Sequence, residues 1–286
     1  MSPTILLPID VEGGSNRVIT HCFDLAEQIG ATVHVLSVVE EAPEVGDLDP
    51  EHRSDITASL TRHAQTTSEQ VADQASERGL ETVVSVREGV ANQQIVQCAE
   101  EYEPEFIVMG TRAHTHPPGI GSTTERVILN SHSPVVSIPL GEDEAEVTGF
   151  DHIIIATDGS EPAERAAERG FDIAERFGAN VSIVYVIDQS IYELTDSPRS
   201  ILGLLKEGGR RAVEDLAVAA RERGIDVTTT VRRGNTDQEL LEYMADRDGD
   251  LAVMGVSGRG GVGNRFLGST TARVLRGSKR PVLTAR

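Results

Sequence analysis

One internal repeat limits the folds open to this chain of 286 residues more than any other feature. The segment Ile5–Glu40 aligns without a gap with Ile153–Asp188, and FIVMG and GSTTERVILNSHSPVV later match LAVMG and GSTTARVLRGSKRPVL in the same order. A period near 147 residues is longer than the unit of any solenoid, so the chain is a duplicated domain. We predict domains at residues 1–140 and 151–286, joined by a polar, acidic linker that begins at Gly141.

Within each copy, short apolar runs alternate with longer segments of helical periodicity. In the second copy we expect strands at 152–156, 180–186, 226–231, 250–254 and 281–284, and helices at 162–177, 199–223, 236–247 and 270–276. The second of these helices should be broken or loosened near Gly208-Gly209. Runs such as Ile153-Ile154-Ile155 are continuously apolar, which is typical of strands covered on both faces. The pattern predicts an α/β fold with two similar doubly wound domains, each with a five-stranded parallel sheet in the order 3-2-1-4-5 and helices on both faces.

The segment LAVMGVSGRGGVGNRFLGSTT, residues 251–271, has the layout of a phosphate-holding loop between a buried strand and a helix. Gly255 and Gly258 stand three residues apart, and after nine more residues comes the run GSTT that begins at Gly268. Glycines let backbone N–H groups approach an anion closely, and the hydroxyl residues offer donors and a helix N-cap. We expect Gly258 to need both close approach and a positive φ. Because ligands of doubly wound sheets bind where the winding reverses, Asp158 should lie beside Gly255.

The charge of this region differs from that of the rest of the chain. Residues 255–286 contain seven basic residues and no Asp or Glu, whereas the whole chain has a formal net charge of −20. A polyanionic ligand best explains such a basic island in an acidic protein. Arg259 and Arg265 lie within the glycine loop and are placed to reach phosphates, although loop arginines are more often solvated.

Two simpler motifs compete for the same glycines. The run from Gly258 to Gly263 satisfies G-x-G-x-x-G, but the dinucleotide fingerprint follows the first strand of its unit and has an acidic residue about 20 positions on. No acidic residue follows here. The run from Gly263 to Ser269 has the glycine spacing of a P-loop but lacks its lysine. We reject both motifs.

The whole-chain composition excludes several classes of protein. No apolar run approaches the roughly 20 residues of a membrane span, and the first residues lack a basic leader, so we expect a cytoplasmic protein without a membrane partner. The acidity argues against nucleic acid. Only two of the 26 basic residues are lysines, and so acidic a surface is best tolerated in the salt-rich cytoplasm of a halophile. Cys22 and Cys98 are expected to be buried, reduced thiols.

These residues resemble the universal stress protein family in its tandem two-domain form. The resemblance is carried by G-2x-G-9x-G-S/T from Gly255 to Ser269 and by strand ends at Asp158 and Asp188. It implies that ATP, with or without Mg²⁺, binds the second domain with adenosine at Asp158 and Val186, and with ribose and phosphates on the glycine loop. The implied binding residues are Ala156, Thr157, Asp158, Val186, Met254, Gly255, Gly258, Gly268, Ser269, Thr270 and Thr271. No catalytic or metal-ligating residue is assigned, and an Asx turn or N-cap remains an equal alternative for Asp158.

The first copy departs from the motif. Its second glycine is replaced by Ala113, seven residues instead of nine precede Gly121, and Pro117-Pro118 adds no N–H donors. His114 and His116 favour an exposed loop over a metal site. We therefore predict one nucleotide per chain, in the second domain, with the first domain empty or much weaker.

The function that these features predict is that of an ATP-binding stress-response or regulatory protein. Its two copies are expected to form an internal pseudo-dimer, and the chain to homodimerise in addition. The alternative is a slow nucleotide hydrolase or adenylate-handling enzyme of the same fold, which would need a positioned base or nucleophile facing the phosphates. An accessory domain that gates a transporter is a third class that the residues neither favour nor exclude.

Overall fold

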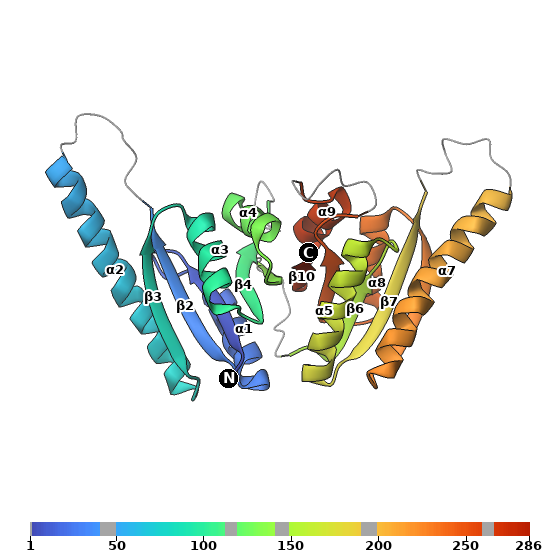
Figure 1. Ribbon diagram of the computed structural model, residues 1–286, viewed down its shortest axis with the longest axis horizontal. Coiled ribbons are helices and arrows are strands. Elements are labelled where there is room, and N and C mark those ends of the chain that lie inside the picture. Colours follow the sequence, from blue (N-terminus) through green and yellow to red (C-terminus); the bar gives the residue numbers. More distant parts are fainter. Residues whose placement is uncertain (1, 41–49, 112–118, 141–148, 190–198, 259–265) are drawn as a thin grey trace. The chain divides into compact units, whose positions relative to one another are not determined.

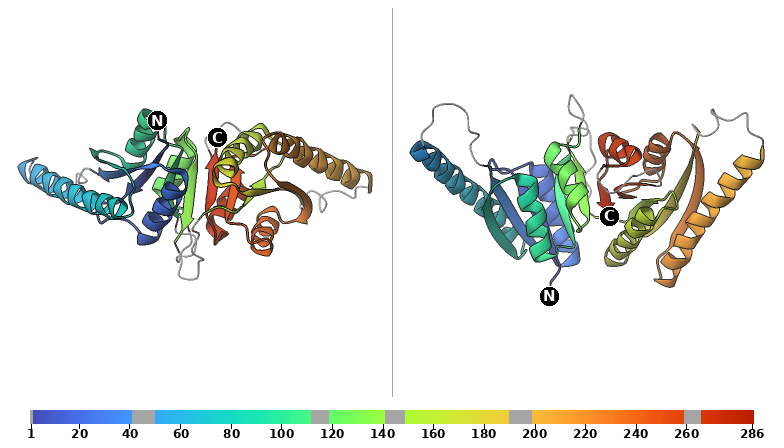
Figure 2. Two further views of the ribbon diagram at one scale, coloured as in Figure 1. Left: turned by 90° about the horizontal axis from the view of Figure 1, so that it is seen from below. Right: turned by 45° about the horizontal axis from the view of Figure 1, so that its top comes forward.

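The computed structural model describes residues 2–40, 50–111, 119–140, 149–189, 199–258 and 266–286 (Figure 1). The chain divides into two compact units, one of residues 1–110 and 122–138 and the other of residues 111–121 and 139–286. Each unit is a parallel sheet with helices on both faces (Figure 2). Among the described residues, no helix combines the length and the hydropathy that crossing a membrane would require.

The first unit alternates strands and helices from its first residues. Its elements are β1 (Thr4–Ile9), α1 (Asn16–Ile29), β2 (Thr32–Val39), α2 (Pro50–Glu77), β3 (Thr82–Glu88), α3 (Ala91–Tyr102), β4 (Phe106–Thr111), α4 (Ser122–Asn130) and β5 (Val135–Pro139). The strands lie in the order β3-β2-β1-β4-β5, and the pairs of β1 with β2 and β4 and of β2 with β3 are parallel. Helices α1 and α2 cover one face, and α3 and α4 cover the other.

The second unit repeats this plan. Its elements are β6 (His152–Ala156), α5 (Glu161–Phe177), β7 (Asn180–Asp188), α7 (Arg199–Glu222), β8 (Val227–Gly234), α8 (Thr236–Asp246), β9 (Leu251–Gly255), α9 (Ser269–Gly277) and β10 (Val282–Ala285). The strands lie in the order β8-β7-β6-β9-β10, with all four neighbouring pairs parallel. The predicted fold class, with the order 3-2-1-4-5, is confirmed.

The central strands are buried because helices cover both of their faces. Ile153, Ile154 and Ile155 of β6 are each at most 1% exposed, as the continuous apolar run predicts. On α5, Gly170 allows the helix to lie directly on this strand, since a Cβ atom there would come within 2.9 Å of Ile155 Cδ1. Helix α5 ends at Gly178, whose φ of 64° is the left-handed conformation that favours glycine. Cys22 and Cys98 are buried and unbridged, as expected.

The predicted break in the long second helix is wrong. Helix α7 runs without interruption through Gly208 and Gly209 (Figure 1). A Cβ atom on Gly209 would lie 2.7 Å from Tyr185 Cδ1 of β7, whereas one on Gly208 would meet no atom within 4 Å. Gly209 therefore allows close packing of the helix on the strand and does not interrupt the helix.

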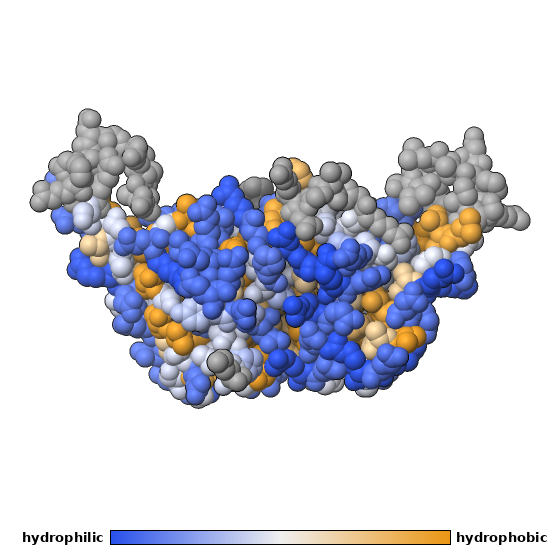
Figure 3. Space-filling model, viewed as in Figure 1, coloured by the Kyte–Doolittle hydropathy of each residue, from blue (hydrophilic) through white to orange (hydrophobic). Residues whose placement is uncertain are grey.

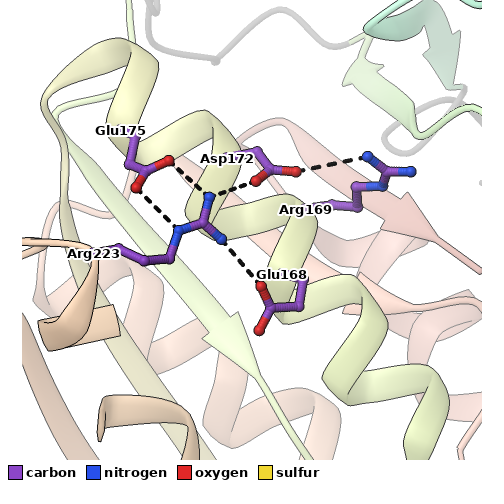
Figure 4. A network of polar contacts seen from close by, with 5 residues as sticks. All are labelled: Glu168, Arg169, Asp172, Glu175 and Arg223. Carbon is purple, nitrogen blue, oxygen red and sulfur yellow. Dashed lines mark hydrogen bonds and ion pairs between the residues drawn. The ribbon is translucent and has the colours of Figure 1, made fainter. Parts of the chain in front are cut away.

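An arginine cluster ties the first helix of each unit to the end of its second helix. In the second unit Arg223 follows α7, and its guanidinium contacts Glu175 at 2.7 Å, Asp172 at 2.5 Å and Glu168 at 3.1 Å, all on α5 (Figure 4). The guanidinium also lies 5.8 Å from the centre of the Phe171 ring. In the first unit, the cluster consists of Arg78 with Asp24, Glu27 and Phe23. The duplication therefore extends to ion pairs that join residues about 50 positions apart.

Candidate functional site

A cavity of about 920 Å³ opens at the carboxyl edge of the second sheet. The ends of β6, β7 and β9, the residues after β9, the start of α9 and parts of α7 and α8 line it. All the residues assigned to the site from the sequence lie along this one cavity, namely Ala156, Thr157, Asp158, Val186, Met254, Gly255, Gly258, Gly268, Ser269, Thr270 and Thr271. The structure thus brings together segments that lie about 100 residues apart in the sequence.

The register of the sheet explains why these segments meet. Strand β6 lies between β7 and β9, with Ala156 beside Val184 and Ile155 beside Val253. Parallel strands end at the same edge, so the residues that follow β6 and β9 emerge side by side at the point where the winding reverses. The backbone N–H of Thr157 still donates to the carbonyl of Val184 at 3.0 Å, which fixes the start of the β6–α5 turn.

The glycine loop passes directly against this turn. A Cβ atom on Gly255 would lie 3.0 Å from the carbonyl oxygen of Pro162, and one on Gly258 would lie 2.5 Å from Asp158 Oδ2. Neither glycine is among the described residues with positive φ, so the expectation of a positive φ at Gly258 is wrong. The close approach of backbone to carboxylate is sufficient reason for a glycine at this position.

Asp158 makes the Asx turn that the sequence offered as one alternative, and the residue also lines the cavity. Its Oδ1 accepts the N–H of Ser160 at 3.0 Å, which is an Asx turn at the start of α5. Its Oδ2 faces Gly258, and the residue lines the cavity. The turn therefore orients the carboxylate, and the same side chain presents an acceptor at the cavity wall.

Helix α9 begins one residue earlier than expected and is not capped by a hydroxyl side chain. Gly268 is the N-cap residue, and its N–H donates to the carbonyl of Val256 at 2.8 Å. The hydroxyl of Thr271 is buried and donates to the carbonyl of Gly255 at 2.9 Å, so its bond is made within the protein. Ser269 and Thr270 form the first turn at the cavity, where helix N–H groups lack intrahelical acceptors and the helix dipole favours an anion.

The basic island does not gather at the cavity. None of its described members, Arg273, Arg276, Lys279, Arg280 and Arg286, lines the wall. Arg273 pairs with Asp237 of α8 at 3.0 Å, and Arg280 lies 4.0 Å from Asp250. Arg273 and Arg280 thus pair with acidic residues of neighbouring segments. The expectation that the basic island serves a polyanionic ligand is therefore wrong for these two arginines. Arg259 and Arg265 lie outside the described residues.

Further cavity residues were missed by the sequence reasoning. They are Ala163, Val184, Tyr185, Ile187, Asp188, Leu205, Thr236, Leu240, Ser257, Phe266 and Leu267. Asp188 ends β7, and its Oδ2 lies 3.5 Å from the hydroxyl of Thr236, the first residue of α8. Their place at the end of a strand beside the reversal point is a signal that could have identified these two residues. Leu205 carries no such signal, because α7 reaches the cavity only through tertiary packing.

The family model described as "Universal stress protein family" matches residues 1–139 and 149–286. The chain belongs to this family. A universal stress protein of Methanocaldococcus jannaschii is 34% identical over 140 residues, which cover 48% of this chain and 82% of that protein. The protein YxiE of Bacillus subtilis is 26% identical over 148 residues, which cover 48% of this chain and 99% of that protein. These relatives match one half of the chain, in agreement with a duplicated domain.

A crystal structure of a universal stress protein from Archaeoglobus fulgidus resembles the whole chain. The match covers 100% of this chain and 97% of that one, with a TM-score of 0.72 and 24% sequence identity. At this identity the likeness concerns the fold. The fold of the whole chain is therefore shared with that protein.

The corresponding carboxylate of the first domain, Asp10, makes the same turn as Asp158 and one further bond in its loop. Asp10 is exposed, and its Oδ1 accepts the N–H groups of Glu12 at 3.1 Å and Gly14 at 2.8 Å. The bond from Thr124 to the carbonyl of Gly110 at 3.1 Å matches that of Thr271 in the second domain. Ala113, His114, His116 and the proline pair lie outside the described residues. Among the described residues, no three His, Cys, Asp or Glu side chains gather as a metal site.

Proposed function

We propose that this universal stress protein is a stress-response or regulatory protein that binds ATP in its second domain. The observation that carries the proposal is the cavity at the reversal point. All the nucleotide-binding residues expected from the sequence line this cavity. At its centre the backbone of Gly258 lies against the Asp158 carboxylate, so the glycine loop and the end of β6 form one wall.

The two ends of the cavity differ in chemistry. Val186 offers an apolar surface and Asp158 an acceptor, which suits an adenine ring with its exocyclic amine. The N–H groups of the glycine loop and of the first turn of α9 suit phosphate oxygens. The hydroxyls of Ser269 and Thr270 provide further hydrogen bonds there, and ATP would be held with or without Mg²⁺.

The first domain, residues 1–140, is in this proposal a degenerate copy, and residues 151–286 form the intact nucleotide-binding domain. Asp10 accepts two N–H groups of its own loop, from Glu12 and Gly14, whereas the printed loop bond of Asp158 is to Ser160 and its other oxygen faces Gly258. We propose a stoichiometry of one nucleotide per chain. The pairing of the two copies as an internal pseudo-dimer, and a homodimer of the chain, are further proposals that rest on the duplication.

A binding role fits the cavity better than catalysis. On the described part of the wall, the carboxylates of Asp158 and Asp188 are held in place by local donors, the N–H of Ser160 and the hydroxyl of Thr236, which suits fixed hydrogen bonds to a ligand. In this proposal, occupancy by ATP is the signal and hydrolysis is at most slow. Phosphate release at saturating ATP measures this directly, and turnover faster than once per minute would favour an enzyme.

The net charge of −20 supports a salt-rich cytoplasm as the setting. Dissolved salt screens repulsion between carboxylates and so stabilises an acidic fold. The thermal midpoint of unfolding should therefore rise steadily from 0.1 to 3 M KCl. A midpoint that is independent of KCl would contradict a halophilic origin.

Isothermal titration calorimetry of nucleotide-free protein tests the central proposal. We expect one ATP per chain and an affinity that falls at least tenfold in Asp158→Asn, because hydrogen bonds to charged groups contribute about 1.5–3 kcal/mol. The matched variant Asp10→Asn should leave ATP binding unchanged. Two equivalent ATP sites, or equal losses in both variants, would refute the assignment to the second domain.

A further inference from the structure

Strand β8 forms one edge of the sheet of the second domain. The order of the described strands ends with β8, which pairs with β7 from Val227 to Gly234. Among the described strands, no other pairs with it. Thr228 and Thr229 are both exposed, although successive side chains of a strand point to opposite faces of the sheet. The outer edge of β8 is therefore accessible to another strand.

The bonds to β7 determine which backbone groups of β8 face outward. The carbonyls of Asp226 and Gly234 accept N–H groups from the first part of β7 and from the residue that follows it. In a parallel pair, the backbone groups of alternate residues point to the same side. The even-numbered residues of β8 therefore bond to β7. The N–H and C=O groups of Val227, Thr229 and Val231 point away from the sheet.

The outer edge of β8 lacks the features that commonly prevent edge strands from pairing. Charged residues and proline serve that purpose in many proteins with β-sheets. The run VTTTV, residues 227–231, contains neither. The visible surface is mostly hydrophilic, in keeping with the net charge of −20 (Figure 3). An uncharged open edge in so acidic a chain favours a strand that pairs with another strand.

The sequence around Thr229 suits pairing with a second copy of the same strand. The run VTTTV reads the same in both directions, so an antiparallel pair centred on Thr229 would place threonine opposite threonine and valine opposite valine. The outward groups of Thr229 would bond to the same residue of the second copy. This register also places Asp226 opposite Arg232 at both ends of the pair. Moving the centre by one residue places Asp226 opposite Thr230 or Gly234 instead.

Both charged groups of this register can take part in the contact. Asp226 is exposed, and the side chain of Arg232 is 27% exposed. Arg232 contacts Glu239 of its own domain through Nε at 3.0 Å, and its Nη1 donates to the carbonyl of Glu239 at 3.2 Å. A guanidinium carries five N–H donors, so it can bind a second carboxylate as well. Two ion pairs, one at each end, would fix the register.

We propose that β8 is the surface through which two copies of this chain associate, with the two strands antiparallel and Thr229 at the two-fold axis. The sheets of the two second domains would then continue into each other. The ladder of backbone hydrogen bonds would supply affinity, and the ion pairs of Asp226 with Arg232 would supply the register. This inference specifies the surface of the homodimer proposed above and does not depend on nucleotide binding.

The edge strand of the first domain, β3, is less suited to such a pair. An acidic and a basic residue, Glu81 and Arg87, have the same spacing there. The equivalent register would place Val83 opposite Ser85, so an apolar side chain would face a hydroxyl. Both Nη atoms of Arg87 donate to Glu101, and the side chain of Arg87 is only 17% exposed. Strand β3 therefore provides matched control variants.

Sedimentation equilibrium of the full chain measures the association. We expect a dimer, and Thr229→Pro should weaken it at least tenfold, because proline removes the central outward N–H without removing a bond to β7. Val84→Pro makes the equivalent change at the centre of β3 and should leave the dissociation constant within twofold. A monomeric wild type, or a dimer that is unaffected by Thr229→Pro, would overturn the proposal.

Charge reversal tests the register. Asp226→Arg and Arg232→Asp should each be monomeric alone, because like charges then face each other at both ends. An equal mixture of the two variants should dimerise, because every facing pair is then opposite in charge. Recovery in the mixture also shows that both variants are folded. A mixture that stays monomeric, although both variants keep the thermal midpoint of the wild type, would overturn the register.

Cross-linking tests the same register without changing a charge. Thr229→Cys should form a disulfide-linked dimer under mild oxidation, since facing residues of a hydrogen-bonded pair have Cα atoms about 5.5 Å apart. Val231→Cys should link at least tenfold more slowly, because the two copies of residue 231 would lie about 13 Å apart along the strands. Equal rates would overturn the register. None of these measurements requires ATP, so failure of this proposal and failure of nucleotide binding are recognised separately.

Discussion

The hydroxyl of Thr271 donates a 2.9 Å hydrogen bond to the carbonyl of Gly255, so the first turn of α9 is fastened to the end of β9 across the base of the glycine loop. Thr124 makes the equivalent bond to Gly110 in the first domain at 3.1 Å. Both threonines are buried. The bond therefore closes the loop in each copy, whatever the sequence of the loop between its ends.

Replacing Thr271 by Val leaves a buried carbonyl without its donor, which costs about 1–3 kcal/mol of folding free energy. We expect Thr271→Val to lower the thermal midpoint and to weaken ATP binding several-fold, because both ends of the loop then shift. Thr124→Val should lower stability by a similar amount and leave ATP binding unchanged. Calorimetry and thermal melting of both variants separate the effect on ATP binding from the effect on stability. A loss of ATP affinity in Thr124→Val would refute the assignment of the site to the second domain.

Gly258→Val should weaken ATP binding strongly and leave the fold intact. A Cβ atom there would lie 2.5 Å from Asp158 Oδ2, so the loop and the carboxylate must move apart, and the two γ-methyl groups would block the approach of the ligand. We expect the affinity to fall on the order of a hundredfold, which equals the loss of one or two charge-assisted hydrogen bonds. The equivalent first-domain change, Ala113→Val, is the control. Unchanged ATP affinity in Gly258→Val would refute the assigned loop.

The adjacent glycines of α7 should respond to alanine with opposite signs. Gly208→Ala meets open space and should stabilise the second domain by about 0.5–1 kcal/mol, because alanine is the better helix former. Gly209→Ala must displace the ring of Tyr185 and should destabilise by about 1–3 kcal/mol. Urea unfolding measures both changes. If both variants are stabilised, α7 does not pack on β7 as described.

The arginine clusters predict how stability depends on pH. The hydrogen bond from Arg223 lowers the pKa of the Glu175 carboxyl in the folded state below its ordinary value of 4.5. A carboxyl whose folded pKa is lowered stabilises the fold above its unfolded pKa, and this contribution disappears as the pH falls through the folded pKa. Arg223→Gln should therefore be less stable than the wild type at pH 7, and the difference should shrink below about pH 4.5.

The same measurement applies to the first domain, where Arg78 lowers the pKa of Glu27 through an equivalent hydrogen bond. Denaturant midpoints of Arg78→Gln and Arg223→Gln between pH 3 and pH 7 should follow parallel curves. Because these side chains are partly exposed, the effect should also shrink in molar salt. A stability difference that grows as the pH falls would contradict the described ion pairs.

The sequence predicted most of the fold because its signals are local. Continuous apolar runs such as Ile153-Ile154-Ile155 are typical of buried strands. Because the domain is duplicated, the same pattern of strands and helices occurs in both copies and supports each element twice. The residues predicted for the site line one cavity for a related reason. A motif of fixed spacing determines where both ends of a loop lie once its strand and helix are known, so Gly255 and Ser269 had to reach the same edge of the sheet.

The errors arose where a residue acts through a partner distant in sequence. Gly209 was read as a helix breaker because nothing near it in the sequence reveals Tyr185, 24 positions away. The basic island was assigned to a ligand because the pairing of Arg273 with Asp237, 36 positions away, appears only in three dimensions. Leu205 was missed because α7 reaches the cavity only through tertiary packing.

The described wall of the cavity presents backbone amides, hydroxyls and carboxylates but neither lysine nor arginine. Attraction between separated opposite charges fades as dissolved ions accumulate, whereas a hydrogen bond depends on contact and direction. Hydrogen bonds made by this described part of the wall would therefore respond little to the concentration of dissolved salt.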